Sequence, residues 1–438
     1  MEHTPSSNQK TIRTVRILRV DKKGRGVGET ETGGVLTIPF TIPGERVEAV
    51  KLKRKEGRLL QILEASPHRT AASCSHFSTC GGCTWQHIDY GRQLHIKKET
   101  IAELCRRHGI QFKPTDLAIT PSAPFEYRNR MDFVWWNDGR FGLRQRGKWH
   151  SVVNLQECRL LPHSVMNTAL EVNRRVQNAG LPFCDQVRKT PGLRYLVVRR
   201  GVFTGEIMLL FVSDSMHLPP LLWQGLDRVV SVYQLINDNP QNDTSDGIPV
   251  HLAGNENLRE LIGEHPFSIG PRCFFQPNPA VAQRMVMYVR DLLSAADHSN
   301  GCLLDLFCGV GLFTASTADL FQKTMGIEFS EEAVSFARRN AAGLAAEFLC
   351  KDAGELTTEH FADADTLIVD PPRDGIPPRT MKWILTHPFQ EIIYISCNPR
   401  RGIEDAAKLL AKYNLQSIRL FDQFPQTPHV EMIAHFRG

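Results

Sequence analysis

The stretch CLLDLFCGVGLFT, residues 302–314, decides the fold of the second half of the chain. An apolar run, 302–306, enters a turn with Gly309 and Gly311, and a helical pattern follows. A buried strand that ends in a glycine turn before a helix is the first unit of a doubly wound α/β sheet, which binds ligands at the carboxyl ends of its strands. The pattern is shared by several nucleotide-binding sheets, so the next strands must decide which ligand it serves.

The second strand, 325–328, ends in a carboxylate, Glu328, that is suited to holding two ribose hydroxyls. Further along, Asp352 stands where an adenine amino group could be bound. Together these residues describe S-adenosylmethionine more closely than a dinucleotide. A dehydrogenase is the alternative for this block, but it has no use for a cysteine in the crevice.

That cysteine is Cys397, in YISCNPR, residues 394–400, directly after the apolar run 391–395. For a lone cysteine, a buried structural thiol is the usual alternative. Methylation of an unreactive base carbon, however, requires a nucleophile that adds at the adjacent position. Arg373 and Arg400 are candidates for stabilising its thiolate. Glu431, at the start of the last strand, is the available base for the proton that must then leave, although an acid near the chain end is usually solvated.

Asp370 in DPPR, residues 370–373, follows a further strand and helps to choose the target base. RNA cytosine-5-methyltransferases carry a cysteine in this proline-rich loop, and this chain has none there. A carboxylate accepts a hydrogen bond from the N3–H of uracil, whereas unprotonated cytosine presents an acceptor at that position. The loop therefore favours uracil over cytosine.

Eleven cysteines without a secretion signal are typically reduced, metal-bound or catalytic. Cys74, Cys80 and Cys83 lie within ten residues in a Gly- and Ser-containing loop, and Cys158 is the best candidate for a fourth ligand. Zinc and iron–sulfur readings share these ligands, and spacing does not separate them. Five further thiols are expected in buried positions: Cys105, Cys184, Cys273, Cys302 and Cys350.

Short strands are predicted between residues 10 and 67, with a glycine-rich turn at 24–28, as in a small closed β-barrel. Residues 10–69 hold 14 Lys and Arg against 7 Asp and Glu, while the whole chain of 438 residues carries a net charge of only +5. The positive charge is thus concentrated in the N-terminal module. A basic surface of this kind can bind a polyanion, or it can simply face solvent, and the charge alone does not distinguish these two interpretations.

The chain is long enough for two or three domains. It contains no apolar run long enough to cross a membrane, and residues 1–10 are polar. We expect a cytoplasmic protein with no membrane association, and nothing in the sequence implies a protein partner. A helix is predicted over 91–109, a second over 279–293, and a β-rich region from about 127 to 265.

Five short motifs follow one another along the second half of the chain: F-x-Q-x-N (274–278), D-L-F-C-G-x-G (305–311), D-P-P-R (370–373), S-C-N-P (396–399) and H-V-E (429–431). With the C-x5-C-G-x-C cysteine spacing before them, the chain resembles the class I RNA uracil-5-methyltransferases, and its layout is most similar to the 23S ribosomal RNA enzymes. The barrel resembles a TRAM domain. The resemblance implies that Cys397 is the nucleophile and Glu431 the base. It also implies a donor and base pocket lined by Gln276, Phe307, Glu328 and Asp370; Asp352 matches less firmly because relatives vary there.

The resemblance further favours a 4Fe-4S cluster over zinc, on Cys74, Cys80, Cys83 and Cys158. The expected architecture has three parts: a TRAM-like OB barrel (10–67), a central β-rich domain with the cluster (68–265), and a Rossmann-like α/β methyltransferase domain (266–438) on which 91–124 pack. The expected substrate is a uridine in 23S ribosomal RNA, with tRNA as the alternative. The non-enzymatic alternative is an RNA-binding protein whose methyltransferase fold is catalytically inactive.

Overall fold

The predicted strand at residues 302–306 lies inside an eight-stranded sheet of the computed structural model, which describes residues 12–111, 117–185, 187–237, 247–356 and 363–438. In spatial order, the strands are β18 (Ala346–Cys350), β17 (Lys323–Glu328), β16 (Cys302–Leu306), β19 (Thr366–Val369), β20 (Glu391–Ser396), β22 (Glu431–Arg437), β21 (Asn414–Phe421) and β6 (Ala118–Thr120). The first five are mutually parallel, and β22 runs antiparallel to both of its neighbours.

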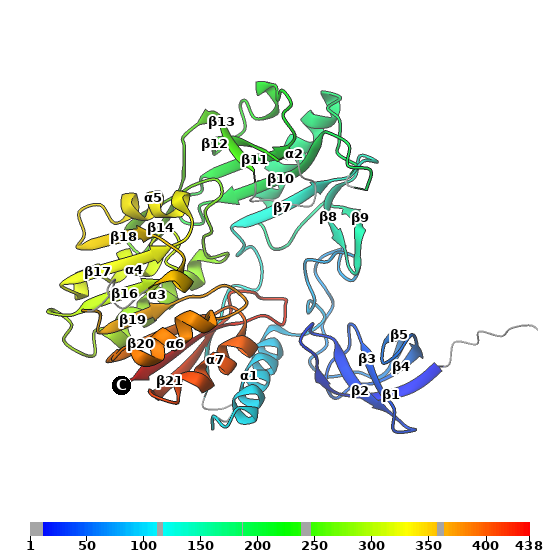
Figure 1. Ribbon diagram of the computed structural model, residues 1–438. Coiled ribbons are helices and arrows are strands. Elements are labelled where there is room, and N and C mark those ends of the chain that lie inside the picture. The colour runs from blue at the N-terminus through cyan, green and yellow to red at the C-terminus, as the bar shows by residue number, and fades with distance from the viewer. Residues whose placement is uncertain (1–11, 112–116, 186, 238–246, 357–362) are drawn as a thin grey trace, which may run out of the picture.

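Alternate residues of these strands face two separate buried clusters, so the sheet is covered on both sides. Leu303 and Ile393 belong to the cluster with the helices α3 (Pro279–Leu293), α4 (Leu312–Thr317) and α5 (Glu331–Asn340). Leu304 and Ile392 belong to the other cluster, with α1 (Tyr90–Arg107), α6 (Pro378–Thr386) and α7 (Pro399–Leu409). Figure 1 shows the two helical layers on either side of the sheet. The doubly wound α/β prediction is confirmed.

Two segments from the first third of the chain complete this region. β6 pairs in parallel with β21 at the sheet edge, and α1 contributes Ile101, Ala102 and Cys105 to the cluster that contains α7. Local signals set the helix ends, because the Asp89 side chain accepts the amide of Arg92 at the start of α1 and two arginines lie in its last turn. The sequence predicts both α1 and α3 to within two residues.

The central part is a seven-stranded sheet, with α2 (His163–Asn178) against one face. Its strands, in spatial order, are β13 (Ile248–Gly254), β12 (Val229–Ile236), β11 (Ile207–Ser213), β10 (Leu193–Arg200), β7 (Arg130–Trp135), β8 (Phe141–Gln145) and β9 (Lys148–Asn154). On the other face, Val197 and Leu210 join the same buried cluster as α3 and Leu303. The hairpin of β14 (Leu258–Ile262) and β15 (His265–Ile269) leads on to α3. The sequence did not predict α2.

The N-terminal strands form a separate five-stranded sheet in the order β3 (Val35–Ile38), β2 (Gly26–Thr30), β1 (Ile12–Val20), β4 (Arg46–Lys51) and β5 (Gly57–Glu64). A bridge between Thr37 and Glu56 brings the two edge strands together. Its small core includes Val15, Ile38 and Val47. Gly26 is required here, because a Cβ would lie 2.0 Å from the Thr41 hydroxyl. Residues 10 and 11 of the predicted barrel lie outside the described residues.

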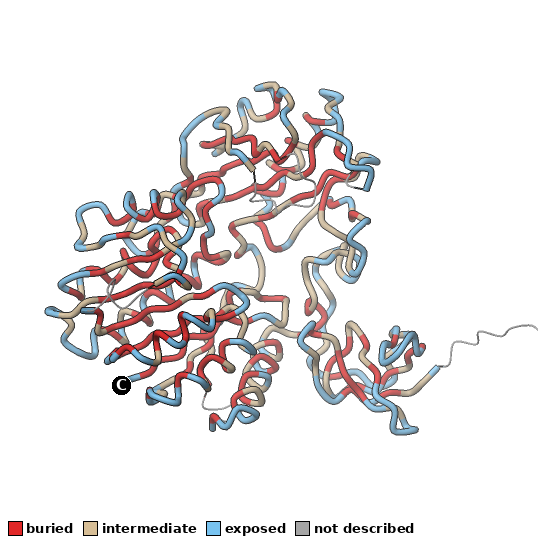
Figure 2. The backbone as a smooth tube through the Cα atoms, in the orientation of Figure 1, coloured by how far each residue is buried: buried red, intermediate tan, exposed pale blue. Residues whose placement is uncertain are grey.

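Burial follows this plan: Figure 2 shows the buried backbone concentrated along the strands of the two large sheets. Short 3-10 turns at Pro220–Leu222, Ala318–Leu320 and Ala353–Glu355 complete the described elements. Within the described parts of the chain, no helix is both long and apolar enough to span a membrane.

Candidate active site

The ends of three neighbouring strands bring both predicted catalytic residues and one predicted pocket residue to the same end of the sheet. Asp370 follows β19, Cys397 follows β20, and Glu431 begins the antiparallel β22. Ser396 pairs with Met432 across β20 and β22. Cys397 and Glu431, each one residue further toward the same end of the sheet, therefore lie at the ends of adjacent strands.

Burial controls the protonation of this group. It raises the pKa of Cys397 to about 12, and the carboxylates of Glu431 and Asp370 add to the effect, while Arg373 opposes it. Glu431 is 1% exposed, and its Oε1 has no hydrogen-bond partner among the described residues. Burial, with the nearby charge of Asp370, raises its pKa well above the ordinary value. The free protein therefore holds Cys397 as the protonated thiol.

Gln276 orients Asp370 rather than capping a helix. Its Nε2 donates to Asp370 Oδ2 at 3.4 Å, and its Oε1 accepts from Gln423 Nε2 at 3.3 Å. The cap of α3 is Asn278, whose side chain accepts the amide of Val281 at 3.3 Å. Burial raises the pKa of Asp370 to about 7, so this carboxyl changes charge near neutral pH.

The glycine turn and the end of β17 are joined through Glu328. Its two carboxylate oxygens accept the backbone amides of Gly309 at 3.1 Å and Ser330 at 2.9 Å. Phe307, between β16 and the turn, has a positive φ of 64°, which is a strained conformation for a residue with a side chain and is typical of a functional turn. Asp352 is exposed at the start of a 3-10 turn, where it accepts the amide of Gly354.

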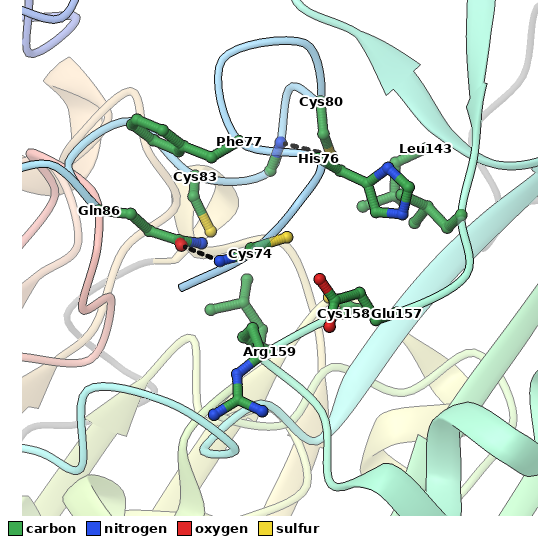
Figure 3. A pocket seen from close by; sticks show the side chains of 13 residues that line it. Cys74, His76, Phe77, Cys80, Cys83, Gln86, Leu143, Glu157, Cys158 and Arg159 are labelled. Carbon is green, nitrogen blue, oxygen red and sulfur yellow. Dashed lines mark hydrogen bonds between the residues drawn. The ribbon is translucent and has the colours of Figure 1, made fainter. Parts of the chain in front are cut away.

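The four predicted metal-ligating cysteines line one pocket between the loop 74–83 and the segment around Cys158, as Figure 3 shows. Burial raises the pKa of Cys83 to about 12 and that of Cys158 to about 11, and the other thiols of the pocket raise both further. Gly82 donates its amide to Cys80 Sγ at 3.4 Å. Each thiolate in this pocket would repel the others, and a bound cationic centre would remove that repulsion.

Among the described residues, no three His, Cys, Asp or Glu side chains are grouped as ligands of a metal ion. The four thiols line one pocket without forming a grouped ligand set, so the arrangement does not separate zinc from an iron–sulfur centre.

Comparison with known proteins shows the family to which this chain belongs. Residues 266–364 and 354–436 match the family model described as tRNA (Uracil-5-)-methyltransferase. A protein of Nanoarchaeum equitans described as an uncharacterized RNA methyltransferase is 34% identical, over 94% of this chain and 90% of its own length. The chain belongs to the RNA (uracil-5-)-methyltransferase family.

Two further relatives of this methyltransferase carry more specific names. The tRNA (uracil(54)-C(5))-methyltransferase of Pyrococcus horikoshii is 33% identical, over 92% of this chain and 95% of its own length. The crystal structure of the Pyrococcus abyssi tRNA (uracil-54, C5)-methyltransferase in complex with S-adenosyl-L-homocysteine superimposes with a TM-score of 0.79 at 29% identity, covering 97% of this chain and all of that one.

The methyltransferase also has two side chains near these strand ends, one acidic and one aromatic, that the sequence did not single out. Asp305 is fully buried and accepts the amide and hydroxyl of Thr314, and burial raises its pKa to about 7. Phe329, directly after Glu328, is 75% exposed. Its position directly after the acidic residue at the end of a strand is the sequence signal that could have marked Phe329 as part of the candidate site.

Two expectations require correction. Cys350 was expected in a buried position but is exposed, and Cys302 is only half-buried, because both lie at strand ends. Of the two arginines considered for the thiolate, Arg373 acts on the pKa of Cys397. Arg400 is exposed at the start of α7 and is not among the largest influences on the pKa of Cys397.

Proposed function

We propose that this methyltransferase transfers a methyl group from S-adenosylmethionine to C5 of a uridine in RNA, with Cys397 as nucleophile and Glu431 as base. The observation that carries the proposal is the placement of a thiol and a buried carboxyl on adjacent strand ends, beside Asp370, with no hydrogen-bond partner for the carboxyl Oε1 among the described residues. A structural thiol would not require that carboxyl.

The reaction proceeds in three steps. Cys397 first loses its thiol proton to solvent; the thiolate Sγ then forms a bond to C6 of uracil, and the C5–C6 π electrons move toward O4, which makes C5 nucleophilic. C5 takes the methyl group, and the methyl–sulfur bond of the donor breaks to leave S-adenosylhomocysteine. Glu431 then accepts the C5 proton, the C5–C6 double bond re-forms, and the thiolate leaves. Arg373 is the cation that favours the thiolate at the start and the end of this sequence.

Asp370 selects uracil as the target nucleobase. As a carboxylate it accepts the N3–H of uracil, and Gln276 holds it in place. Since the pKa of Asp370 is raised to about 7, the accepting form becomes more populated as the pH rises through neutrality. We expect the affinity for the target RNA to rise over the same interval.

The donor is assigned to Phe307, Glu328 and Asp352 at the neighbouring strand ends. Glu328 and the glycine turn are already preorganised by the amides of Gly309 and Ser330. This follows the rule for doubly wound sheets, which bind ligands outside the carboxyl ends of their strands.

RNA is the partner that the exposed surface favours. Trp149, near the tip of the β8–β9 hairpin, is 65% exposed beside the exposed Lys148. No Asp or Glu occurs from residue 139 to 156, a stretch with four Lys and Arg. An exposed aromatic ring among cations is a typical platform for unpaired bases. We assign the basic N-terminal sheet to a TRAM-like OB barrel that also binds RNA.

A 4Fe-4S cluster is our assignment for the four-thiol pocket, held by Cys74, Cys80, Cys83 and Cys158. Such a centre would supply positive charge to otherwise repelling thiolates and cross-link two distant chain segments. We assign it a structural role, because its ligands lie outside the methyltransferase sheet.

The experiment is incubation of anaerobically purified protein with labelled S-adenosylmethionine and unmodified tRNA or 23S ribosomal RNA, followed by digestion to nucleosides. Label in 5-methyluridine supports the proposal. The tRNA substrate is tested first because the named Pyrococcus relatives modify uracil 54; label in 23S RNA alone would favour the substrate predicted from the sequence. Label in 5-methylcytidine, or none in either RNA, would refute the proposal.

A further inference from the structure

The loop that precedes Glu431, residues 422–430 between β21 and β22, is held by residues from far earlier in the chain. At its start, Asp422 Oδ1 accepts from Lys97 Nζ at 2.5 Å and Oδ2 accepts from Tyr90 OH at 2.8 Å, and both charged side chains are fully buried. Further on, Pro425 O accepts from Tyr127 OH at 3.1 Å. The loop is thus fixed to α1 and to the linker that follows β6.

Gln426 is the centre of this arrangement. It is 3% exposed and has a positive φ of 66°. Its carbonyl accepts the amides of Thr84 at 2.8 Å and Trp85 at 3.0 Å. Since Thr84 directly follows Cys83, the cysteine-rich loop is hydrogen-bonded to the chain five residues before Glu431.

Gln93 of α1 completes the contact with a reciprocal pair of hydrogen bonds. Its Oε1 accepts the amide of Gln426 at 3.0 Å, and its Nε2 donates to Gln426 Oε1 at 3.0 Å. The same Nε2 also lies within hydrogen-bond distance of Ile88 O at 2.9 Å. Gln93 is completely buried, so these bonds are shielded from water and would be costly to leave unmade.

Glu431 has no comparable support of its own. Its Oε1 is buried and has no partner among the described residues. Because no hydrogen bond holds Oε1, the position of the carboxyl depends on the backbone at the start of β22, which follows the loop centred on Gln426. A proton-accepting group must lie within hydrogen-bond reach of the proton it removes.

We propose that Gln93 and Gln426 are positioning residues for Glu431: their paired hydrogen bonds fix the loop 422–430 so that the carboxyl reaches the C5 proton of the methylated uracil. This inference rests on the proposed function. Loss of the pair slows the last step, proton removal and release of Cys397, and leaves adduct formation by Cys397 intact, because the thiol lies on a different strand.

The test is Gln93→Met, which keeps the length of the side chain and removes its hydrogen bonds. Its control is Tyr413→Phe, which removes a buried hydroxyl that donates to Ile384 O at 2.8 Å and His387 O at 2.7 Å, away from the loop. Stability in denaturant, kcat, KM for the RNA, and the fraction of RNA bound covalently to protein on denaturing gels are measured for both.

For Gln93→Met we expect kcat to fall about 10- to 100-fold, KM to change little, and covalent RNA–protein adduct to accumulate. Tyr413→Phe loses stability and keeps kcat and the adduct level of the wild type. Parallel loss of adduct and product in Gln93→Met, or behaviour like that of Tyr413→Phe, would overturn the inference. Absence of 5-methyluridine with the wild type would instead refute the proposed function.

Gln426→Gly keeps the test decisive should Gln93→Met not fold. Glycine retains the backbone bonds to Thr84 and Trp85 and adopts the positive φ without strain, while the side-chain bond to Gln93 is lost. The same accumulation of adduct is expected, and a wild-type ratio of adduct to product would contradict the proposed positioning role.

Discussion

Two buried glutamates lie at opposite ends of the same pair of strands, and their surroundings differ completely. Glu391, at the start of β20, accepts from His435 Nε2 at 2.5 Å and lies 3.1 Å from His298 Nε2 and 3.5 Å from Arg437. Glu431, at the start of β22, is equally buried, and its Oε1 lacks a partner in the described structure. One carboxyl is satisfied, and the other is left available.

The pKa values follow this difference. Burial alone would raise the pKa of Glu391, but His435, Arg437 and His298 bring it below the ordinary value. Burial together with the charge of Asp370 raises the pKa of Glu431 well above that value, against the opposing effect of Arg373. Burial therefore does not identify a functional carboxyl. Burial without compensation is the better guide, because an uncompensated buried acid costs stability and such groups are concentrated at functional sites.

The largest expected effect is that of replacing Glu431, the uncompensated carboxyl of the two. Glu431→Gln cannot accept the C5 proton, and we expect turnover to fall by roughly 10³-fold. The folded state should not be weakened, since a buried acid without a partner is replaced by a neutral amide. Single-turnover kinetics and denaturant unfolding measure the two quantities. Loss of stability with normal turnover per folded molecule would contradict the assignment.

Glu391→Gln should give the opposite result. It removes a buried carboxylate from two histidines and an arginine, and we expect the free energy of unfolding to fall by about 3 kcal/mol. Turnover per folded molecule should stay at the wild-type value, because Glu391 lies at the far end of β20 from Cys397. A catalytic defect in this variant at full stability would show that the two ends are not independent.

The pH dependence of stability sharpens the comparison further. The lowered pKa of Glu391 stabilises the fold above the ordinary glutamate pKa, and this contribution is lost as the pH falls through the folded value. The raised pKa of Glu431 acts in the other direction: the folded state binds this proton more tightly, so stability falls as the pH rises above the ordinary value.

Urea unfolding at several pH values should therefore separate the two variants. Relative to the wild type, Glu391→Gln should lose its deficit toward acid pH, and Glu431→Gln should gain stability by up to about 1.4 kcal/mol for each pH unit above the ordinary glutamate pKa. Parallel curves for the two variants would show that both carboxyls share one environment.

The smallest effect concerns the thiol. With its pKa raised to about 12, Cys397 should react with iodoacetamide slowly at neutral pH, at a rate that still rises above pH 9. Glu431→Gln removes one of the charges that oppose the thiolate, so its alkylation should be several-fold faster. Mass spectrometry of the peptide that contains Cys397, with Cys397→Ala as the blank, measures the rate. An unchanged rate would show that Glu431 does not act on this thiol.

The sequence by itself determined the doubly wound α/β fold and the motifs at its strand ends, because strand period, glycine turns and helix caps are local signals. The nucleophile, the base and the ligand set remain predictions drawn from those motifs. Tertiary structure alone decided which buried carboxyl is compensated, that Arg373 acts on Cys397, that Cys350 is exposed, and that Gln93 contacts Gln426. Each of these depends on side chains that meet across long sequence separations, and neither spacing nor periodicity carries information about such contacts.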